Sequence, residues 1–363
     1  MKFRCERDVL VEALATAGRA ATGKANLRVL SGVRLDLAGN QLRVTGTDLE
    51  LTMTTSVEVA GSSDGVAVLP AKLAVDIVRN LEPGAVEVDT DAERPRITGG
   101  RSEFLLNVAS ADEFPVPQAV DGEAVTISGQ QLADGLRQVV GAASTDESRR
   151  LLTGVLLAAE ESGLRMVATD SYRLAFREFP GTTVLKQGQR VNVPSRALQE
   201  LTRVLSDDLD VEVVLADTMV SFQVGPLLLS SWLIKEDFPD YAKLIPSDMP
   251  NELVVDRQAL QDAIRRVRVM ARENSPIRLT MSSDGLRLSA VTPDVGEATE
   301  DVDSDYNGEE LTVAFNPEYL MDGLEVTAGD EVVLQTRDPQ KPAVLRSTDS
   351  NDFLYLLMPV RVS

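Results

Sequence analysis

The sequence of 363 residues contains no histidine and a single cysteine, Cys5. Most acid–base relays, nucleophile triads and zinc sites use imidazole, so the absence of histidine argues against those classes of enzyme. One cysteine cannot form an internal disulfide, which is typical of a protein in a reducing compartment. It also excludes a metal site built from several cysteines.

Long hydrophobic runs are missing as well. Hydrophobic residues make up 43% of the chain, but no stretch of them is long enough to cross a bilayer as a helix. The N-terminus has no basic segment followed by an apolar stretch and a cleavage site, so we expect a cytoplasmic protein without a membrane partner. A chain of 363 residues predicts two or three domains.

Basic residues are outnumbered by acidic ones. The chain has 36 Lys and Arg against 57 Asp and Glu, which gives a net charge of −21. Such a charge argues against binding to nucleic acid, because phosphate contacts depend on Lys and Arg. That argument fails if the bases are concentrated on one surface of the protein.

One pattern occurs three times along the chain. Similar turn-and-strand segments, whose leucines are 122 residues apart, occupy 40–44, 162–166 and 284–288. Amphipathic stretches with helical spacing precede them at 8–19, 130–140 and 256–270. A proline at a predicted helix start follows each of them, at Pro70, Pro194 and Pro317. The chain therefore contains three copies of one module.

Each copy has the order helix, hairpin, further strands, helix and more strands. This order predicts an α+β fold in which two helices pack on antiparallel sheets. A copy is too long for a solenoid unit and has enough apolar positions for its own core. We therefore predict three domains, at 1–120, 121–246 and 247–363.

The charges are unevenly distributed between helices and the rest of the chain. Six predicted helical segments hold 15 Lys and Arg against 14 Asp and Glu, whereas the remainder holds 21 against 43. These segments are 7–24, 71–82, 129–150, 194–205, 256–273 and 316–325. A locally basic surface of helices could hold DNA loosely through its phosphates. The alternative is that these bases lie on ordinary solvated helix faces.

No catalytic residue, metal site or cofactor site is predicted. The sequence has no Gly-rich phosphate loop with its lysine, no zinc-ligand spacing and no EF-hand loop. Asp301, Asp303 and Asp305 resemble a cation-binding run, but the glycine and glutamate of a calcium loop are out of register. We interpret them as a solvated acidic edge. An enzyme with paired carboxylates stays possible, although no pair is singled out.

Three segments, set in three copies of one module, carry a resemblance to a known family. Residues 169–175, 238–241 and 357–362 resemble those of the bacterial DNA polymerase III β subunit, the sliding clamp. The resemblance covers essentially the whole chain and implies the DNA-clamp fold without catalysis. It implies a head-to-tail homodimer whose six domains form a ring around duplex DNA, with helices lining the hole. Such a ring confers processivity by tethering the polymerase III α subunit, the clamp loader and other proteins with a clamp-binding motif.

The resemblance also implies which residues contact DNA, whatever its base sequence. By position these are Lys24, Lys72, Arg79, Arg149, Arg150, Arg196 and Arg203. A closed ring stays on DNA by topology, so these contacts can be weak enough to permit sliding.

A peptide pocket between the second and third domains is a further implication. By position it involves Leu152, Thr169, Ser171, Tyr172, Arg173, Leu174, Pro239, Lys243, Leu244, Asn316, Tyr319, Met358, Pro359, Val360 and Arg361. Aliphatic walls and an adaptable methionine suit varied peptides. Only the second copy has the pair Arg173 and Leu174 after its Thr-Asp turn. The alternative is that Leu152, Leu174 and Met358 are simply core residues.

For the contact between two chains, the resemblance places Phe104 and Leu106 of the first copy against Val269 and Met270 of the third. A partner strand would protect the edge of the first copy. Three copies per chain favour a ring of two chains, whereas a eukaryotic-type clamp has two repeats and closes as a trimer.

A scaffold that binds peptides without DNA is the rival hypothesis, and it predicts a pocket but no ring. Two positions depart from the family pattern and bear on partner preference. Tyr172 stands where many members have histidine, and Ser363 adds one polar residue beyond the usual hydrophobic end.

Overall fold

The computed structural model describes residues 1–22, 27–91, 94–107, 109–182, 184–206, 208–271 and 275–361. Contacts between residues divide the chain into two compact units. Unit 1 comprises Met1–Gln130 and Arg196–Leu233, and unit 2 comprises Gln131–Ser195 and Ile234–Ser363. Each unit thus combines a terminal repeat with part of the central one.

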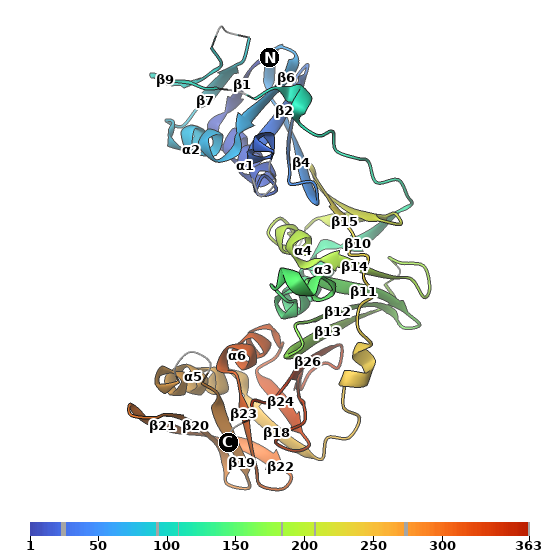
Figure 1. Cartoon of the computed structure of the whole chain (residues 1–363), viewed down its shortest axis with the longest axis vertical. Helices are drawn as coiled ribbons and strands as arrows, with labels where there is room; N and C mark the ends of the chain where they lie inside the picture. Colours follow the sequence, from blue (N-terminus) through green and yellow to red (C-terminus); the bar gives the residue numbers. More distant parts are fainter. Residues whose placement is uncertain are drawn as a thin grey trace. The chain divides into compact units, whose positions relative to one another are not determined.

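Over the described residues the α-helices occur in pairs, one pair to a repeat, as the sequence predicts. The first helices are α1 (Arg7–Gly18), α3 (Gly129–Val139) and α5 (Arg257–Val267), and the second are α2 (Ala71–Asn80), α4 (Ser195–Thr202) and α6 (Pro317–Val326). Within each unit, α1 lies beside α2 and α5 beside α6 (Figure 1). None of the helices in the described residues is long and apolar enough to span a membrane.

Local chemistry explains where these helices begin and end. Pro317 occupies the first turn of α6, and the Asn316 side chain before it accepts a hydrogen bond from the Glu318 amide at 2.8 Å. The Asp256 carboxylate caps α5 in the same way, through the Ala259 amide at 2.7 Å. The first helix of the third repeat is shorter than predicted, because its last turn, η6 (Arg268–Met270), is a 3-10 turn.

Unit 1 contains two antiparallel sheets among its described residues. The five-stranded sheet has the order β5 (Ala60–Ser63), β1 (Lys2–Glu6), β7 (Ala85–Asp89), β8 (Arg96–Gly99) and β9 (Ser102–Leu105). The eight-stranded sheet has the order β10 (Ala124–Ser128), β15 (Asp210–Leu215), β16 (Met219–Val224), β17 (Leu227–Trp232), β4 (Leu51–Glu58), β3 (Gln41–Thr47), β2 (Gly32–Ala38) and β6 (Gly65–Pro70). This larger sheet joins two repeats, because β4 pairs with β17 from Leu51 opposite Ser231 to Thr55 opposite Leu227.

Unit 2 is built in the same way over its described residues. Its nine-stranded sheet has the order β14 (Arg190–Pro194), β11 (Gly154–Glu160), β12 (Gly163–Thr169), β13 (Arg173–Pro180), β26 (Phe353–Leu357), β25 (Ala343–Ser347), β24 (Glu331–Thr336), β18 (Asn251–Asp256) and β22 (Ser304–Asn307). Its four-stranded sheet has the order β21 (Gly296–Val302), β20 (Gly285–Thr292), β19 (Ile277–Ser282) and β23 (Leu311–Phe315). Strands β13 and β26 join the second repeat to the third, from Arg173 opposite Leu357 to Arg177 opposite Phe353.

Burial differs between the joining strand β26 and the end strand β9. Every residue of β26 is buried, because Leu354 and Leu356 pack in a cluster with Tyr241 while Tyr355 faces Gly323 of α6. A strand covered on both faces is typical of a sheet interior. In contrast, all four residues of β9 are exposed. The α+β architecture of antiparallel sheets and paired helices is thus confirmed.

The core of unit 1 forms where the helices meet the sheets. Leu10 and Leu14 of α1 are fully buried in a cluster with Leu35 of β2 and Val78 of α2. Gly46 allows this close approach, since a Cβ atom there would lie 2.0 Å from the carbonyl oxygen of Ala17. Any side chain at this position would therefore push α1 away from β3.

Candidate functional site

A pocket of about 350 Å³ lies in unit 2, beside the start of β13 and the end of β26. Its lining residues are Thr169, Ser171, Arg173, Leu174, Lys243, Leu244, Pro246, Lys341, Pro342, Leu356 and Met358. Seven of them are among the predicted pocket residues, namely Thr169, Ser171, Arg173, Leu174, Lys243, Leu244 and Met358. The structure thus brings together side chains that are far apart in the sequence.

Four lining residues were not predicted: Pro246, Lys341, Pro342 and Leu356. Lys341 and Pro342 lie in the loop between β24 and β25, which carries no feature of the repeat. Leu356 lies two residues before the predicted Met358, so the terminal strand itself could have indicated it. Pro246 follows the 3-10 turn η5 (Tyr241–Leu244) that carries Lys243.

The other predicted pocket residues are not among those that line the pocket. Leu152 is buried, Pro239, Tyr319, Pro359 and Val360 are partly buried, and Tyr172 and Arg361 are exposed. Asn316 serves as the cap of α6. The backbone amides of Met358 and Val360 donate to the carbonyl oxygens of Tyr172 and Ala314, each at 2.8 Å. These two bonds hold the C-terminal segment against the start of β13 and the end of β23.

A tight turn before β13 positions the pocket residues. The Asp170 carboxylate accepts from the amides of Tyr172 and Arg173, at 2.9 and 3.0 Å, while Ser171 has a positive φ of 81°. The Thr169 hydroxyl donates to the Arg173 carbonyl oxygen at 2.7 Å. Non-glycine residues seldom adopt a positive φ because this conformation is sterically unfavourable. The hydrogen bonds of the Asp170 and Thr169 side chains stabilise the turn in spite of that cost.

The same turn occurs in the first repeat. Leu49 has a φ of 80°, the Asp48 carboxylate accepts from the amides of Glu50 and Leu51, and the Thr47 hydroxyl donates to the Leu51 carbonyl oxygen. The first and second repeats therefore share this turn, and the residues that follow it distinguish the second copy.

Arg173 connects the pocket to three other elements of unit 2. Its side chain is only 11% exposed, forms an ion pair with Asp322 of α6, and donates to the Gly141 carbonyl oxygen at 2.7 Å and the Tyr355 hydroxyl at 3.2 Å. Its Nε lies 3.0 Å from the Asp170 carboxylate. The guanidinium thus fixes the turn to β26 and α6.

Electrostatics and burial hold Arg173 and Tyr355 each in one protonation state. Burial by itself lowers the pKa of Arg173, but Tyr355, Asp322 and Asp170 outweigh it and raise the pKa overall. Burial also raises the pKa of the Tyr355 hydroxyl. Arg173 therefore stays charged and Tyr355 neutral at every physiological pH.

An aromatic pair borders the cluster. The rings of Tyr172 and Tyr319 are stacked with their centres 6.3 Å apart, and the Arg173 guanidinium lies 4.5 Å from the centre of the Tyr319 ring. Tyr172 is nevertheless 57% exposed.

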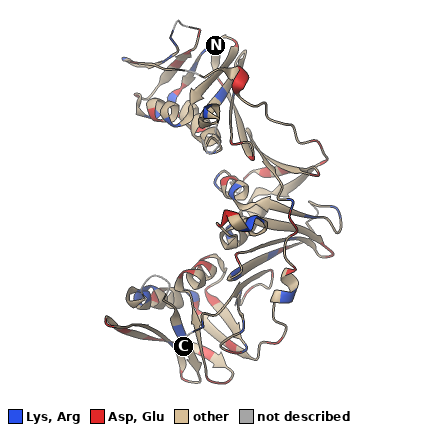
Figure 2. Cartoon of the chain, in the orientation of Figure 1, with Lys and Arg blue, Asp and Glu red and all other residues tan. Residues whose placement is uncertain are grey.

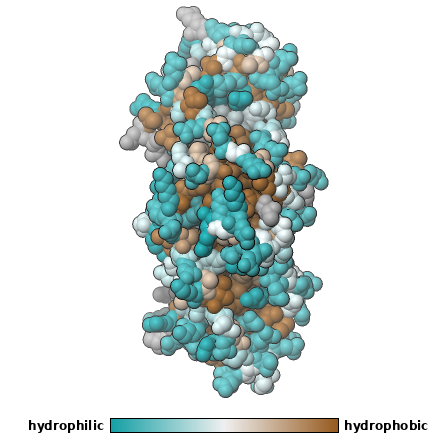
Figure 3. All heavy atoms as spheres, turned by 90° about the vertical axis from the view of Figure 1, so that its right-hand side faces the viewer, coloured by the Kyte–Doolittle hydropathy of each residue, from teal (hydrophilic) through white to brown (hydrophobic). Residues whose placement is uncertain are grey.

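The face in Figure 3 shows hydrophobic patches among mostly hydrophilic residues. Exposed hydrophobic groups such as Leu244 and Met358 beside a pocket are typical of a binding surface.

Six of the seven bases predicted to contact DNA are described, and they lie on or next to helices and 3-10 turns. Lys72 and Arg79 are exposed on α2, and Arg149 and Arg150 lie in η4 (Glu147–Leu152). Arg196 lies on α4 and Arg203 directly follows it, while Lys24 lies outside the described residues. Figure 2 shows Lys and Arg on several helices.

Several of these bases are engaged within the chain. Arg149 binds the Asp146 carboxylate at 3.1 Å and the Asp170 carbonyl oxygen at 3.0 Å. Arg203 forms an ion pair with Glu200 at 2.7 Å, and Arg196 forms one with Asp48 of the first repeat. Arg196 therefore also fastens α4 to the first repeat.

The residues predicted for the contact between chains differ in accessibility. Phe104 on β9 is 37% exposed, and Val269 in η6 is 79% exposed. Met270 is partly buried. Leu106, by contrast, is 6% exposed and belongs to the core cluster of unit 1. Its neighbour Leu105 is 47% exposed.

Comparison with known families covers almost the whole chain. The family models for the N-terminal, central and C-terminal domains of the DNA polymerase III beta subunit match residues 1–118, 126–240 and 242–361. The chain belongs to the DNA polymerase III beta subunit family. Curated members of this family carry the name beta sliding clamp, and sliding clamps are not enzymes.

Individual sliding clamps resemble the chain over its full length. The beta sliding clamp of Bacillus subtilis is 31% identical, over 99% of this chain and 100% of the relative. Solved sliding clamps of Bartonella birtlesii and Pseudomonas aeruginosa, both bound to griselimycin, are each 30% identical to this chain. Each alignment covers 100% of this chain and 100% of the solved chain. Their TM-scores are 0.94 and 0.93.

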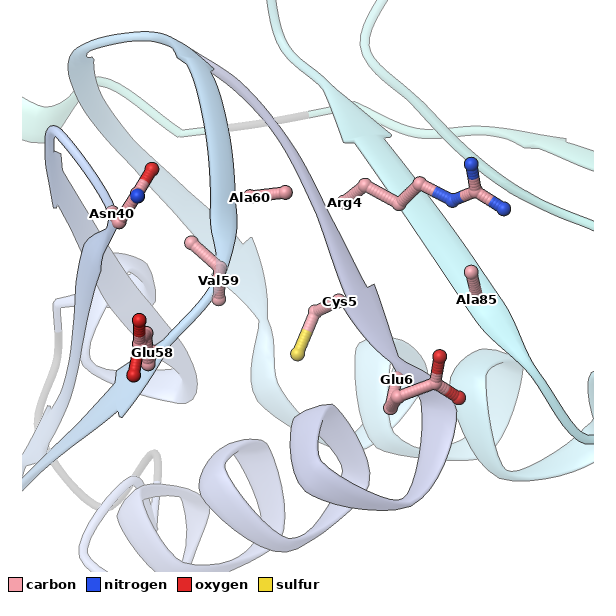
Figure 4. Close-up of a pocket in the computed structure, with 8 residues that line it drawn as sticks. All are labelled: Arg4, Cys5, Glu6, Asn40, Glu58, Val59, Ala60 and Ala85. Carbon is pink, nitrogen blue, oxygen red and sulfur yellow. The ribbon is translucent and has the colours of Figure 1, made fainter.

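A second hollow, a groove of about 490 Å³, lies in unit 1. Its lining residues are Arg4, Cys5, Glu6, Asn40, Glu58, Val59, Ala60 and Ala85. Figure 4 shows that Arg4 extends away from Asn40 and Glu58, and that the Cys5 sulfur points toward the helix beneath β1. Because the polar groups do not converge, the groove provides no obvious ligand site.

Cys5 should react slowly with thiol reagents. The side chain is 6% exposed, and burial raises the pKa of its thiol, so both access and the thiolate fraction are reduced. We expect labelling near neutral pH to be at least about ten-fold slower in the native protein than in urea. The release of a chromophoric thiol measures both labelling rates. Equal rates in the native protein and in urea would show that β1 is open to solvent.

The acidic run near the end of β21 does not form a metal site in the part of the chain that is described. No group of three acidic or cysteine side chains is placed there to hold a metal ion. Instead, the Asp301 carboxylate accepts from Arg287 at 2.6 Å. This ion pair lowers the pKa of Asp301.

Proposed function

We propose that two copies of the chain associate head to tail as a ring that encircles duplex DNA, and that the ring confers processivity on the replicative polymerase. The observation that carries this proposal is that neighbouring repeats share a sheet within the chain, whereas in the described part of the chain the end strands β9 and β21 have no such partner from another repeat. Inside the chain, β4–β17 and β13–β26 ladders join neighbouring repeats. In the described residues, β9 and β21 each end a sheet with one edge unpaired.

Pairing of β9 with β21 of a second copy would repeat the internal arrangement. The five-stranded and four-stranded sheets would merge into one of nine strands, like the sheet that joins the second and third repeats. Exposed strand edges are prone to association, and head-to-tail contacts between two copies close a ring. Phe104 and Val269, both exposed, would then be covered, with Met270 beside them. Leu106, buried in its own core, would support β9 from below.

The charge distribution supports loose binding to DNA. Bases on the helices, among them Lys72 and Arg79, would face the phosphates without recognising base sequence. The net charge of −21 disfavours tight nonspecific wrapping of nucleic acid elsewhere. Topology rather than affinity would hold the ring on DNA.

The pocket at Leu174 and Met358 would hold the partners. We assign it to the polymerase III α subunit, the clamp loader and other proteins with a hydrophobic clamp-binding motif. Its size of about 350 Å³ and its aliphatic walls suit a short peptide. The solved relatives from B. birtlesii and P. aeruginosa bind griselimycin, which supports ligand binding by this fold.

Retention on circular DNA tests this function. The protein is loaded by a clamp loader onto nicked circular plasmid and passed through a sizing column in high salt, before and after linearisation. Co-elution with the circle and loss from the linear form are expected, because a ring slides off an end. If salt removes the protein equally from both forms after verified loading, the scaffold hypothesis replaces the ring.

A further inference from the structure

Glu200 is a buried acid beside the bases of α4 in unit 1. The helix also carries Arg196 and is followed directly by Arg203, two of the residues that we assign to DNA. Residues of both signs are visible on α4 in Figure 2. The Glu200 residue is only 8% exposed. A buried carboxylate needs partners, because its charge is disfavoured away from water.

The partners of Glu200 are two arginines from different repeats. Its Oε1 accepts a hydrogen bond from the Nη1 of Arg203 at 2.7 Å. Its Oε2 lies 2.9 Å from the Nε of Arg19, the residue that caps the end of α1 in the first repeat. The Arg203 side chain is 60% exposed and the Arg19 side chain 29%. One carboxylate therefore holds two cations at this joint between repeats, and Arg203 is the more accessible of the two.

The equivalent base of the first repeat lacks such a partner. Arg79 and Arg203 each lie nine residues after the proline that precedes their helix. Asp76 stands at the place of Glu200 but is exposed, and among the described residues Arg79 forms no ion pair within 4.0 Å. The carboxylate of Glu200 thus distinguishes the base that follows α4 from its counterpart on α2.

We propose that Glu200 moderates the contact between α4 and DNA, because it holds Arg203 in an ion pair that a phosphate group has to break. The inference rests on the proposed encirclement of DNA and gives Glu200 a positioning role without contact to DNA. An arginine that binds a phosphate gains from the release of counterions, but Arg203 first gives up its carboxylate. Glu200 keeps its pair with Arg19 in the meantime, so its buried charge is never left without a cation. A weakened contact at this place favours sliding, since each step along DNA breaks it.

Binding to a short linear duplex tests this role, because a linear fragment reports the contacts without topology. A labelled duplex is titrated with the full chain by fluorescence anisotropy over a series of salt concentrations. Glu200→Gln keeps the size of the side chain and an acceptor oxygen but removes the charge. We expect it to bind about 3-fold more tightly at low salt, and the slope of log K against log salt to become steeper by about 0.9, as for one additional phosphate contact. A merely structural role would leave that slope unchanged.

Three further variants locate the effect. Glu212→Gln is the matched control, since it changes the net charge equally at an exposed acid on β15 of the same unit, and it should bind like the unaltered chain. Glu200→Asp retains the charge and should keep the slope of the unaltered chain, even where the shorter side chain lowers stability. Combining Glu200→Gln with Arg203→Gln should remove the gain, because the released base is then absent.

Two results would overturn the moderating role. One is binding by Glu200→Gln that is no tighter than binding by Glu212→Gln, and the other is a gain that persists without Arg203. Retention of the unaltered chain on circular plasmid is measured alongside. Loss of that retention would refute the proposed encirclement, whereas retention without the gain in affinity would refute this inference alone.

Discussion

A chain carrying Leu105→Asp is expected to be monomeric at concentrations where the unaltered chain is dimeric. Leu105 is 47% exposed on β9, at the open edge that we assign to the contact between chains. An aspartate there would be buried without a partner, which costs about 3–5 kcal/mol at each interface. Dimerisation should weaken by at least about 100-fold, and sedimentation velocity over a concentration series measures it.

Leu228→Asp is the matched control. Leu228 is 39% exposed, similar to the residues of β9, but its strand β17 is paired on both sides, with β16 and β4. This variant should dimerise normally. If Leu105→Asp also remains a dimer while its hydrogen exchange stays native, the edge of β9 is not the contact surface.

Arg173→Ala is expected to destabilise unit 2 and to abolish peptide binding. The change leaves Asp170 buried without its cation and removes the donors to Tyr355 and Gly141. Breaking a largely buried ion pair from one side costs about 3–5 kcal/mol. Urea unfolding measures the loss of stability, and hydrogen exchange of the β13 and β26 amides shows whether the loss is local to that ladder.

Two further variants separate charge from geometry. Arg173→Lys retains the positive charge but loses the planar fork of donors, so its stability should be intermediate. Arg137→Ala removes a pair with Asp134 in which both side chains are about half exposed, and it should change little. If Arg173→Ala is as stable as Arg137→Ala, the Arg173 cluster does not hold β13 to β26 and α6.

Local structure followed from the sequence more readily than contacts between repeats. Helix starts were predicted well because Pro70, Pro194 and Pro317 and the amphipathic spacing are local signals. Which strand of one repeat pairs with which strand of the next is a long-range property. Nothing in β4 or β17 marks them as partners, and β26 shows only that it is buried on both faces.

The candidate site illustrates the same limit. Residues 169–174 were singled out by the resemblance, and Arg173 and Leu174 also because the other copies lack this pair. Lys341 and Pro342, by contrast, lie in a loop without any repeat feature. Leu106 was predicted in the contact between chains, beside Phe104, because the resemblance places it there. The strand β9 ends at Leu105, and the side chain of Leu106 directly after it lies in the core cluster of unit 1.

The turn that precedes the pocket has a consequence for valency. Leu49, Ser171 and Asp294 have a positive φ at the same place in the three repeats, yet only the second repeat continues with Arg173 and Leu174. A ring of two such chains would therefore offer two docking sites among its six modules. Such a ring would hold the proteins docked at its two sites at a high effective concentration relative to each other, so that partners could be exchanged without leaving the DNA.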